Sequence, residues 1–129
     1  MTEYYLEGTT KTPEIKLNGE TGIFEFSGRS IPEISFEFYA PMFSWLENYA
    51  RHPKPTTIVH TKFEYFNTSS SKSILDFFKA LEDLHENGYS AVTIKWYHAH
   101  DDDAMEEAGE EYKLLVKVPF EIISVVVDN

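Results

Sequence analysis

The chain has 129 residues with 22 acidic and 11 basic side chains, a formal net charge of −11 and no cysteine. This length favours a single domain over residues 1–129, and the negative charge is unsuited to a nucleic-acid partner, whose phosphates are bound by Lys and Arg. The lack of cysteine excludes disulfides and thiolate metal sites. No apolar run reaches the roughly 18 residues of a membrane span, and the first residues lack the pattern of a signal peptide. We therefore expect a cytoplasmic protein without membrane insertion.

The first predicted elements form a β-hairpin. Residues 12–28 read TPEIKLNGETGIFEFSG, with apolar side chains at Ile15 and Leu17 and then at Ile23, Phe24 and Phe26. The Asn-Gly and Thr-Gly pairs between these two groups are typical of turns. The pattern predicts two antiparallel strands joined by a short turn.

A helix is predicted next, within residues 31–53, where apolar side chains recur every three or four positions. These side chains are Phe36, Tyr39, Met42, Phe43, Leu46 and Tyr49. Pro41 lies among them, and proline removes a backbone donor, so the helix either begins near Pro41 or is kinked there. Pro53 and Pro55 are expected to end it.

The second half of the chain is predicted to alternate strands and helices. Residues 56–67 and 89–99 have the composition of strands, and residues 118–127 form an apolar strand. Residues 69–87 show an amphipathic helical pattern closed by Gly88, and residues 101–114 form an acidic helix. Alternation of this kind favours parallel strands with right-handed crossovers. The expected fold class is α/β, a mixed β-sheet with an N-terminal hairpin followed by alternating helices and strands.

Residues 65–72, YFNTSSSK, lie between a predicted strand and the amphipathic helix. Asn67 or Thr68 suits the N-cap position, because a side-chain oxygen there accepts a hydrogen bond from the first turn. A cap needs one such residue, whereas residues 68–71 are four consecutive hydroxyl residues. A helix N-terminus favours an anion and Lys72 adds a positive charge, so a phosphate on Thr68 would be accommodated. The residues alone leave two interpretations open, a plain cap and a phosphorylation site.

A second cluster, His98, His100 and the aspartates 101–103, contains residue types that bind metals. We expect no metal site, because the histidines share a face only if the strand continues, and three consecutive aspartates cannot all face one ion. A polar loop whose acids favour the start of the next helix is the simpler interpretation. Glu106 and Glu110 are a candidate carboxylate pair, but no nucleophile partner or glycine-rich phosphate loop accompanies them. We therefore expect no catalytic site and no cofactor.

The run from Phe66 to Ser70, followed by Lys72, resembles the signature of the SiaC-type regulatory phosphoproteins of bacteria. The resemblance covers nearly the whole chain, and the order and spacing of its blocks are more specific than any single block. The other blocks are Gly8-Thr9, residues 12–15, residues 22–28, Ser30 with Pro32-Glu33, Trp45-Leu46, Trp96-Tyr97, the aspartate run, residues 107–111 and Pro119-Phe120. These phosphoproteins are similar in fold to the anti-sigma-factor antagonists, so the resemblance implies a STAS-like fold.

The resemblance also implies a partner-switching cycle centred on Thr68, which occupies the position of the family's phosphoacceptor. A serine/threonine kinase of the histidine-kinase-like ATPase type would phosphorylate Thr68, and a PP2C-type phosphatase would remove the phosphate. Asn67, Ser69, Ser70 and Lys72 would form the surroundings of the phosphosite and the surface on which the partner docks. The unphosphorylated protein would bind and activate a GGDEF diguanylate cyclase, and so promote biofilm growth through cyclic di-GMP.

Two alternatives stay open at this point. An anti-sigma-factor antagonist would share the fold and the phospho-switch but would act on a transcription regulator. A small metal-dependent enzyme would use the histidine and carboxylate cluster. The residues do not separate the first alternative from the cyclase activator, because surface detail selects the partner.

Overall fold

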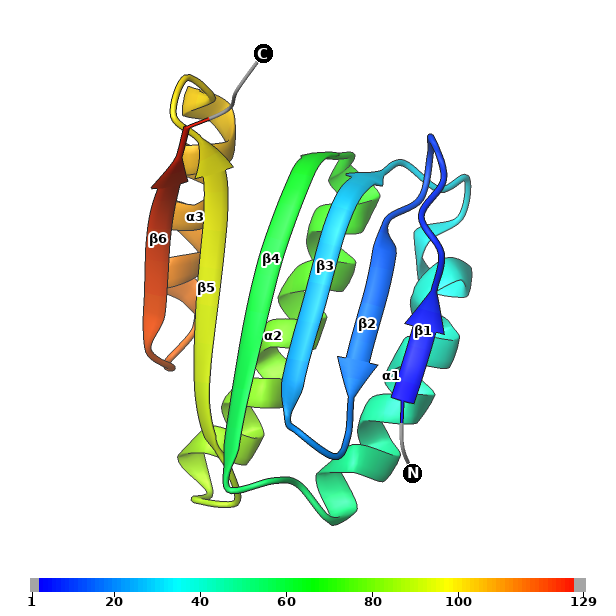
Figure 1. The fold of residues 1–129 in the computed structure, drawn as a ribbon, viewed down its shortest axis with the longest axis vertical. Helices are drawn as coiled ribbons and strands as arrows, with labels where there is room; N and C mark the ends of the chain where they lie inside the picture. The colour runs from blue at the N-terminus through cyan, green and yellow to red at the C-terminus, as the bar shows by residue number, and fades with distance from the viewer. Residues whose placement is uncertain (1–2, 127–129) are drawn as a thin grey trace.

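Within residues 3–126, which the computed structural model describes, the chain forms a six-stranded sheet and three helices (Figure 1). The elements are β1 (Glu3–Leu6), β2 (Glu14–Asn18), β3 (Ile23–Ser30), α1 (Ser35–Arg51), β4 (Thr56–Phe66), α2 (Thr68–Glu86), β5 (Ala91–Ala99), α3 (Asp103–Leu115) and β6 (Phe120–Val125). The strands lie in the sheet in the order of the sequence. Strands β1 to β3 pair antiparallel and β3 to β6 pair parallel. The predicted α/β fold with a mixed sheet is confirmed.

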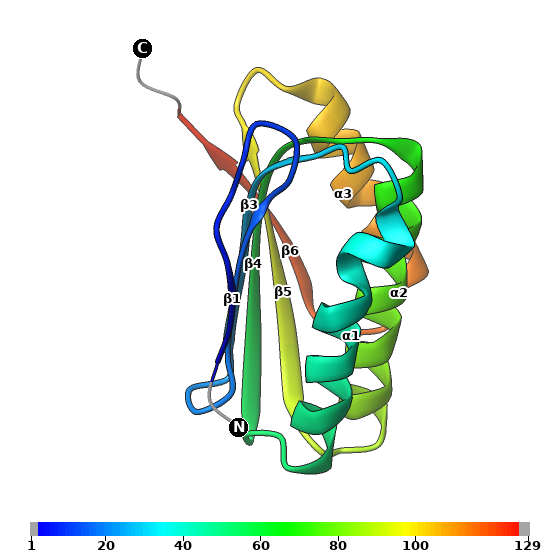
Figure 2. The same ribbon diagram turned by 90° about the vertical axis from the view of Figure 1, so that its right-hand side faces the viewer.

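All three helices cover the same face of the sheet (Figure 2). The strand order explains this, because each parallel connection moves in the same direction across the sheet and right-handed crossovers then place every helix on one side. Side chains on the covered face are buried, as in β4, where they are Thr57, Val59, Thr61 and Phe63. None of α1, α2 and α3 combines the length and the hydropathy that a membrane-spanning helix requires.

The predicted hairpin is confirmed as β2 and β3. The Asn18 side chain stabilises its turn, because Asn18 Oδ1 accepts hydrogen bonds from the amides of Glu20 and Thr21 at 2.9 and 3.1 Å. Gly22 completes the turn with a φ of 76°, a conformation that side chains rarely adopt. Strand β1 pairs with the outer edge of β2 and was not predicted. Its four residues are too few to show a clear alternation of apolar and polar side chains.

Helix α1 begins at Ser35, so Pro41 lies inside the helix and not at its start. Pro41 faces solvent, where water can satisfy the Glu37 carbonyl that the proline leaves without a donor. Phe36 was expected in the apolar stripe but is 73% exposed. The buried residues of α1 are Ser35, Tyr39, Met42, Leu46 and Tyr49. Phe36 lies about 100° around the helix axis from the centre of this buried face.

Helix α2 buries the predicted apolar stripe. The stripe consists of Ile74, Phe77, Phe78, Leu81 and Leu84. As expected, Gly88 terminates the helix: it follows the C-cap residue Asn87 and has a φ of 74°. The amides of Gly88 and Tyr89 donate to the carbonyls of His85 and Leu84 at 3.1 and 3.0 Å, the pattern of a Schellman cap.

The last helix and strand lie close to their predicted ranges. Helix α3 begins at Asp103, with Asp102 as its N-cap. Strand β6 covers Phe120–Val125, and Val127, at the end of the predicted strand, lies outside the described residues.

Candidate functional site

Strand β4 passes into helix α2 through a single residue, Asn67. Asn67 has an extended backbone (φ −84°, ψ 173°), and its Oδ1 accepts a hydrogen bond from the Ser70 amide at 2.9 Å. Its own amide donates to the Ser30 carbonyl at 3.0 Å. Of the two predicted cap candidates, Asn67 is therefore the cap, and Thr68 is the first residue of the helix.

The four consecutive hydroxyl residues at the start of α2 lie in four different environments. Ser69 Oγ donates to Asn67 Oδ1 at 3.2 Å, and Ser71 Oγ donates to the Thr68 carbonyl at 2.7 Å. Ser70 is completely buried. Thr68 is exposed, and its hydroxyl has no hydrogen-bond partner among residues 3–126. Thr68 thus presents an unengaged nucleophile to solvent.

Ser70 belongs to a buried chain of hydroxyl groups that joins α2 to β3 and α1. Ser70 Oγ donates to the Ser30 carbonyl at 3.0 Å, and it lies 2.7 Å from Ser30 Oγ, which in turn lies 2.7 Å from the Tyr39 hydroxyl. Because Ser70 has one proton and gives it to the carbonyl, Ser30 Oγ donates to Ser70 and Tyr39 donates to Ser30. Burial raises the pKa of Tyr39 to about 12, so Tyr39 keeps its proton. Ser70 therefore stabilises the start of α2 from inside the protein, and the expectation that it forms part of an exposed docking surface is wrong because its side chain is completely buried.

The start of α2 is an electropositive place in an acidic protein. Lys72 is exposed and lies four residues after Thr68, so both side chains occupy the same face of the helix. No acidic residue occurs in the first turn. The amides of Thr68 and Ser69 have no carbonyl from a preceding turn to bond, and the helix dipole adds partial positive charge. This arrangement suits a phosphate on Thr68.

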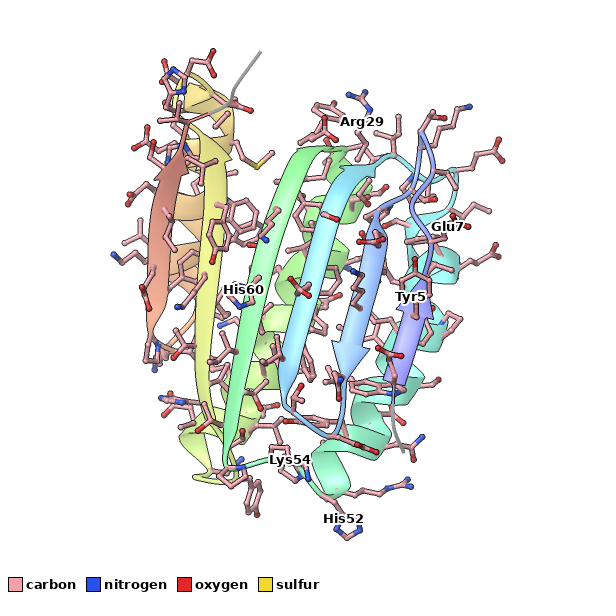
Figure 3. The ribbon with its side chains drawn as sticks, in the orientation of Figure 1. Tyr5, Glu7, Arg29, His52, Lys54 and His60 are labelled. Atoms are coloured by element: carbon pink, nitrogen blue, oxygen red, sulfur yellow. The ribbon has the colours of Figure 1, made fainter. Side chains whose placement is uncertain are left out.

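Arg29 lies at the end of β3, near the point where β4 leads into α2 (Figure 3). A register shift between Gly28 and Arg29 pairs Arg29 with Tyr65, and the Arg29 Cζ atom lies 5.6 Å from the centroid of the Tyr65 ring, which is a cation–π distance. Neither Arg29 nor the role of Ser30 was predicted from the sequence. Parallel strand pairing joins residues far apart in the chain, so no local pattern could have indicated either one.

The histidine and aspartate cluster is divided between two elements. His98 lies in β5 and is 6% exposed, with its Nδ1 2.8 Å from the Ala99 carbonyl, so it belongs to the strand predicted over residues 89–99 and not to the polar loop. Asp102 does support the start of α3, because its Oδ1 accepts a hydrogen bond from the Met105 amide at 3.0 Å. Among residues 3–126, no three His, Asp or Glu side chains are placed to hold a metal ion.

Comparison with known proteins gives a family match over nearly the whole chain. The model of the SiaC family regulatory phosphoproteins matches residues 6–125. An uncharacterised protein of Pseudomonas aeruginosa (strain UCBPP-PA14) is 28% identical over 122 residues, which cover 95% of this chain and 96% of that protein.

Solved structures agree with this match. The structure of SiaC of Pseudomonas aeruginosa superposes with a TM-score of 0.89 at 27% identity, covering 97% of this chain and 100% of that one. A second similar chain comes from the crystal structure of the diguanylate cyclase SiaD in complex with its activator SiaC from Pseudomonas aeruginosa. It has a TM-score of 0.88 at 27% identity and covers 95% of this chain and 99% of that one.

Proposed function

The chain belongs to the SiaC family of regulatory phosphoproteins, and from this premise we propose that it is a non-enzymatic switch, phosphorylated reversibly on Thr68, whose unphosphorylated form activates a diguanylate cyclase. A serine/threonine kinase of the histidine-kinase-like ATPase type adds the phosphate and a PP2C-type phosphatase removes it. The protein acts in the cytoplasm, and residues 1–129 form a single domain. It regulates cyclic di-GMP and, through it, biofilm growth.

The observation that carries the choice of Thr68 is the contrast among the neighbouring hydroxyls. A kinase needs an acceptor hydroxyl that is exposed and free to attack the γ-phosphate. Ser69 and Ser71 engage their hydroxyls in local hydrogen bonds, and Ser70 is buried. Thr68 meets both requirements, and Lys72 stands one turn away to receive the phosphate charge.

A diguanylate cyclase is favoured as the partner because the structurally similar SiaC of Pseudomonas aeruginosa is the activator of the cyclase SiaD in their complex. The similarity extends over 95% of this chain, which supports a partner of the same kind here. No observation of comparable weight favours an anti-sigma factor or a metal-dependent reaction.

The switch itself is electrostatic. A phosphate on Thr68 brings roughly −1.5 to −2 charges at neutral pH. The phosphate binds Lys72 and the free amides of the first turn of α2, so these groups can no longer bind a partner. The water bound to the phosphate must also be removed before a partner can cover it. Like-charge contacts at an interface cost several kcal/mol. Phosphorylation therefore releases the cyclase.

Substitutions at Thr68 test this proposal. We expect Thr68→Ala to bind and activate the cyclase as the wild type does, and Thr68→Glu to bind at least about tenfold more weakly, which corresponds to ~1.4 kcal/mol. The measurement is calorimetric titration against each purified GGDEF diguanylate cyclase of the host, together with an assay of cyclic di-GMP formation.

Ser44→Glu is the matched control, because it places the same charge at an exposed position of α1, outside the residues expected to surround the phosphosite. It should retain most of the affinity. Equal affinities for Thr68→Ala and Thr68→Glu would contradict the switch, as would phosphopeptide mapping that finds the kinase acting on a residue other than Thr68.

A further inference from the structure

The sheet splits between β4 and β5 at their carboxyl ends. The pairing of these strands ends where Thr61 faces Trp96, although β4 continues to Phe66 and β5 continues to Ala99. Figure 1 shows the two strands diverging toward these ends. The split contains a groove with a volume of ≈ 720 Å³, which we call the β4–β5 groove. Its lining consists of residues 62–64, residues 97–102 and Val125.

Aromatic contacts hold the two sides of this groove in place. On the helix side of the sheet, the rings of Phe63 and Phe66 contact Trp96, with ring centroids 6.2 and 6.0 Å apart. On the uncovered face, which Figure 3 views with His60 labelled, the Tyr97 hydroxyl lies 2.8 Å from His60 Nδ1. The rings of His60 and Tyr97 also stack, with centroids 5.7 Å apart. The groove is therefore formed before a ligand enters, which lowers the ordering cost of binding.

A buried histidine in the groove has an unused hydrogen-bonding atom. His98 is 6% exposed, and its Nδ1 lies 2.8 Å from the Ala99 carbonyl oxygen. Because a carbonyl only accepts, Nδ1 carries the proton, and Nε2 of the neutral ring is an acceptor. Nε2 has no partner among residues 3–126, yet no fully enclosed side-chain nitrogen there lacks one. Nε2 is therefore open to the groove that His98 lines, where it can accept from a ligand N–H.

Carboxylates give the groove a negative charge. Glu64 and Asp101 are exposed, and neither belongs to an ion pair within residues 3–126. Asp102 also lines the groove, but its Oδ1 already accepts a hydrogen bond from the Met105 amide. Lys62 is the one lysine in the lining, against these three carboxylates. The balance of charge therefore favours a cationic ligand.

Tyr97 provides an aromatic face for that cation. The Nζ atom of Lys62 lies 5.3 Å from the centroid of the Tyr97 ring, which is a cation–π distance. Lys62 is exposed and has a long flexible stem, so a ligand cation can displace its ammonium group from the ring. Ala99 and Val125, which pair across β5 and β6, add apolar surface for the stem of a ligand.

The arrangement fits an organic cation and not a metal ion. A metal ion needs several converging ligands, and no three His, Asp or Glu side chains among residues 3–126 are placed to hold one. A guanidinium or ammonium group instead requires separate acceptors for its N–H groups and an aromatic face for its charge. The volume of the groove also lies within the usual range of small-molecule sites, about 300–1,000 Å³.

We propose that the β4–β5 groove binds a small organic cation, a guanidinium or primary amine with a short apolar stem. The cation contacts the Tyr97 ring, its N–H groups donate to His98 Nε2 and to the carboxylates of Glu64 and Asp101, and its stem packs against Val125. The groove opens on the face of the sheet that the helices leave uncovered, and the inference does not depend on phosphorylation of Thr68.

Nuclear magnetic resonance titration of the full chain with n-butylguanidinium tests the site. At about 0.15 M NaCl the Debye length is only ~8 Å, which weakens non-specific attraction to the acidic surface. We expect saturable shifts of the amides of residues 62–64 and 97–102 and of the His98 Nε2 resonance. The exposed His52, outside the groove, should show no shift. Pentanoate, an anion with the same butyl stem, should leave all of these resonances unchanged.

Substitutions of exposed residues provide matched controls. Asp101→Asn should weaken binding of n-butylguanidinium by about fivefold or more, because it removes a carboxylate from the groove. Asp103→Asn removes the same charge outside the lining and should change the affinity by less than about twofold. Lys62→Gln should strengthen binding by about two- to threefold, because it removes the competing cation from the Tyr97 ring. Circular dichroism melts establish that all three variants are folded.

Three outcomes would overturn the inference. The first is the absence of shifts at about 10 mM n-butylguanidinium, ten times the ~1 mM dissociation constant expected for a ligand of this size. The second is an equal loss of affinity in Asp101→Asn and Asp103→Asn, which would mean that only the net charge attracts the probe. The third is an equal response to pentanoate, which would mean that the groove recognises the apolar stem and not the cation.

Discussion

At the scale of single residues, the start of α2 shows how four similar side chains acquire different roles. Asn67 caps the helix and Ser69 supports the cap. Ser70 turns inward to Ser30, and Ser71 bonds back to the Thr68 carbonyl. Only Thr68, among the four hydroxyl residues at positions 68–71, is left without a hydrogen-bond partner in the described part of the chain.

The buried hydroxyl chain makes a prediction at this scale. Ser70→Ala removes the acceptor of the buried Ser30 hydroxyl, whose proton is then unsatisfied, and it removes one of two donors to the Ser30 carbonyl, which keeps the Asn67 amide. We expect the free energy of unfolding to fall by about 1–3 kcal/mol, as is usual for unsatisfied buried groups. Urea denaturation followed by circular dichroism measures the change.

Ser69→Ala is the control, because Ser69 is exposed and its loss should alter the free energy of unfolding by less than about 0.5 kcal/mol. A Ser70→Ala variant as stable as Ser69→Ala would show that the hydroxyl chain adds nothing to stability.

At the scale of elements, the position of α3 depends on its contact with β5. The Trp96 side chain of β5 is completely buried, and its Nε1 donates to the Met105 carbonyl of α3 at 2.9 Å. The Trp96 ring also lies against Gly109, where an added Cβ would be 2.4 Å from Trp96 Cδ1. Gly109 therefore allows α3 to approach the sheet closely.

Gly109→Ala tests this contact. Alanine favours a helix over glycine by up to about 1 kcal/mol, but overpacking a rigid buried ring costs about 1–3 kcal/mol. We expect a net loss of stability and a change in Trp96 fluorescence. Guanidinium denaturation followed by fluorescence measures both, with the exposed Glu110→Ala on the same helix as control. A Gly109→Ala protein more stable than the wild type would contradict the close contact.

At the scale of the whole molecule, acidic charge is in excess and mostly unpaired. The chain has 22 acidic and 11 basic residues, and within residues 3–126 the ion pairs are Lys16 with Glu14 at 3.7 Å and Lys79 with Glu82 at 3.4 Å. Such an excess opposes the compact state by self-repulsion and attracts basic surfaces of a partner. The same field therefore disfavours self-association and speeds encounter with the proposed cyclase.

Salt should reveal this self-repulsion. Raising the ionic strength from about 0.01 M to about 1 M shortens the Debye length from ~30 Å to ~3 Å. Since repulsion between acids dominates at neutral pH, we expect the melting temperature at pH 7 to rise with salt, while the association rate with the cyclase falls. A melting temperature that falls with added NaCl would mean that attractive ion pairs outweigh the repulsion.

The sequence by itself determined the features that depend on neighbours along the chain. The apolar stripe of α2 and its termination by Gly88 follow from helical period and capping preference, which need only nearby residues. The same preference narrowed the N-cap to Asn67 or Thr68, and the structure selected Asn67. The alternation of strands and helices along the second half of the chain likewise predicted that the strands there are parallel. Thr68 itself was singled out by resemblance to a family and not by the local pattern.

Only the tertiary structure decided the features that join distant segments. It placed Ser70 against Ser30 and Arg29 beside Tyr65, turned Phe36 to solvent and added β1 to the sheet. It also left the Thr68 hydroxyl exposed and without a hydrogen-bond partner among residues 3–126. The physical reason is range: helix periodicity and capping act over a few residues, whereas strand register and helix packing depend on surfaces that meet only when the chain is folded.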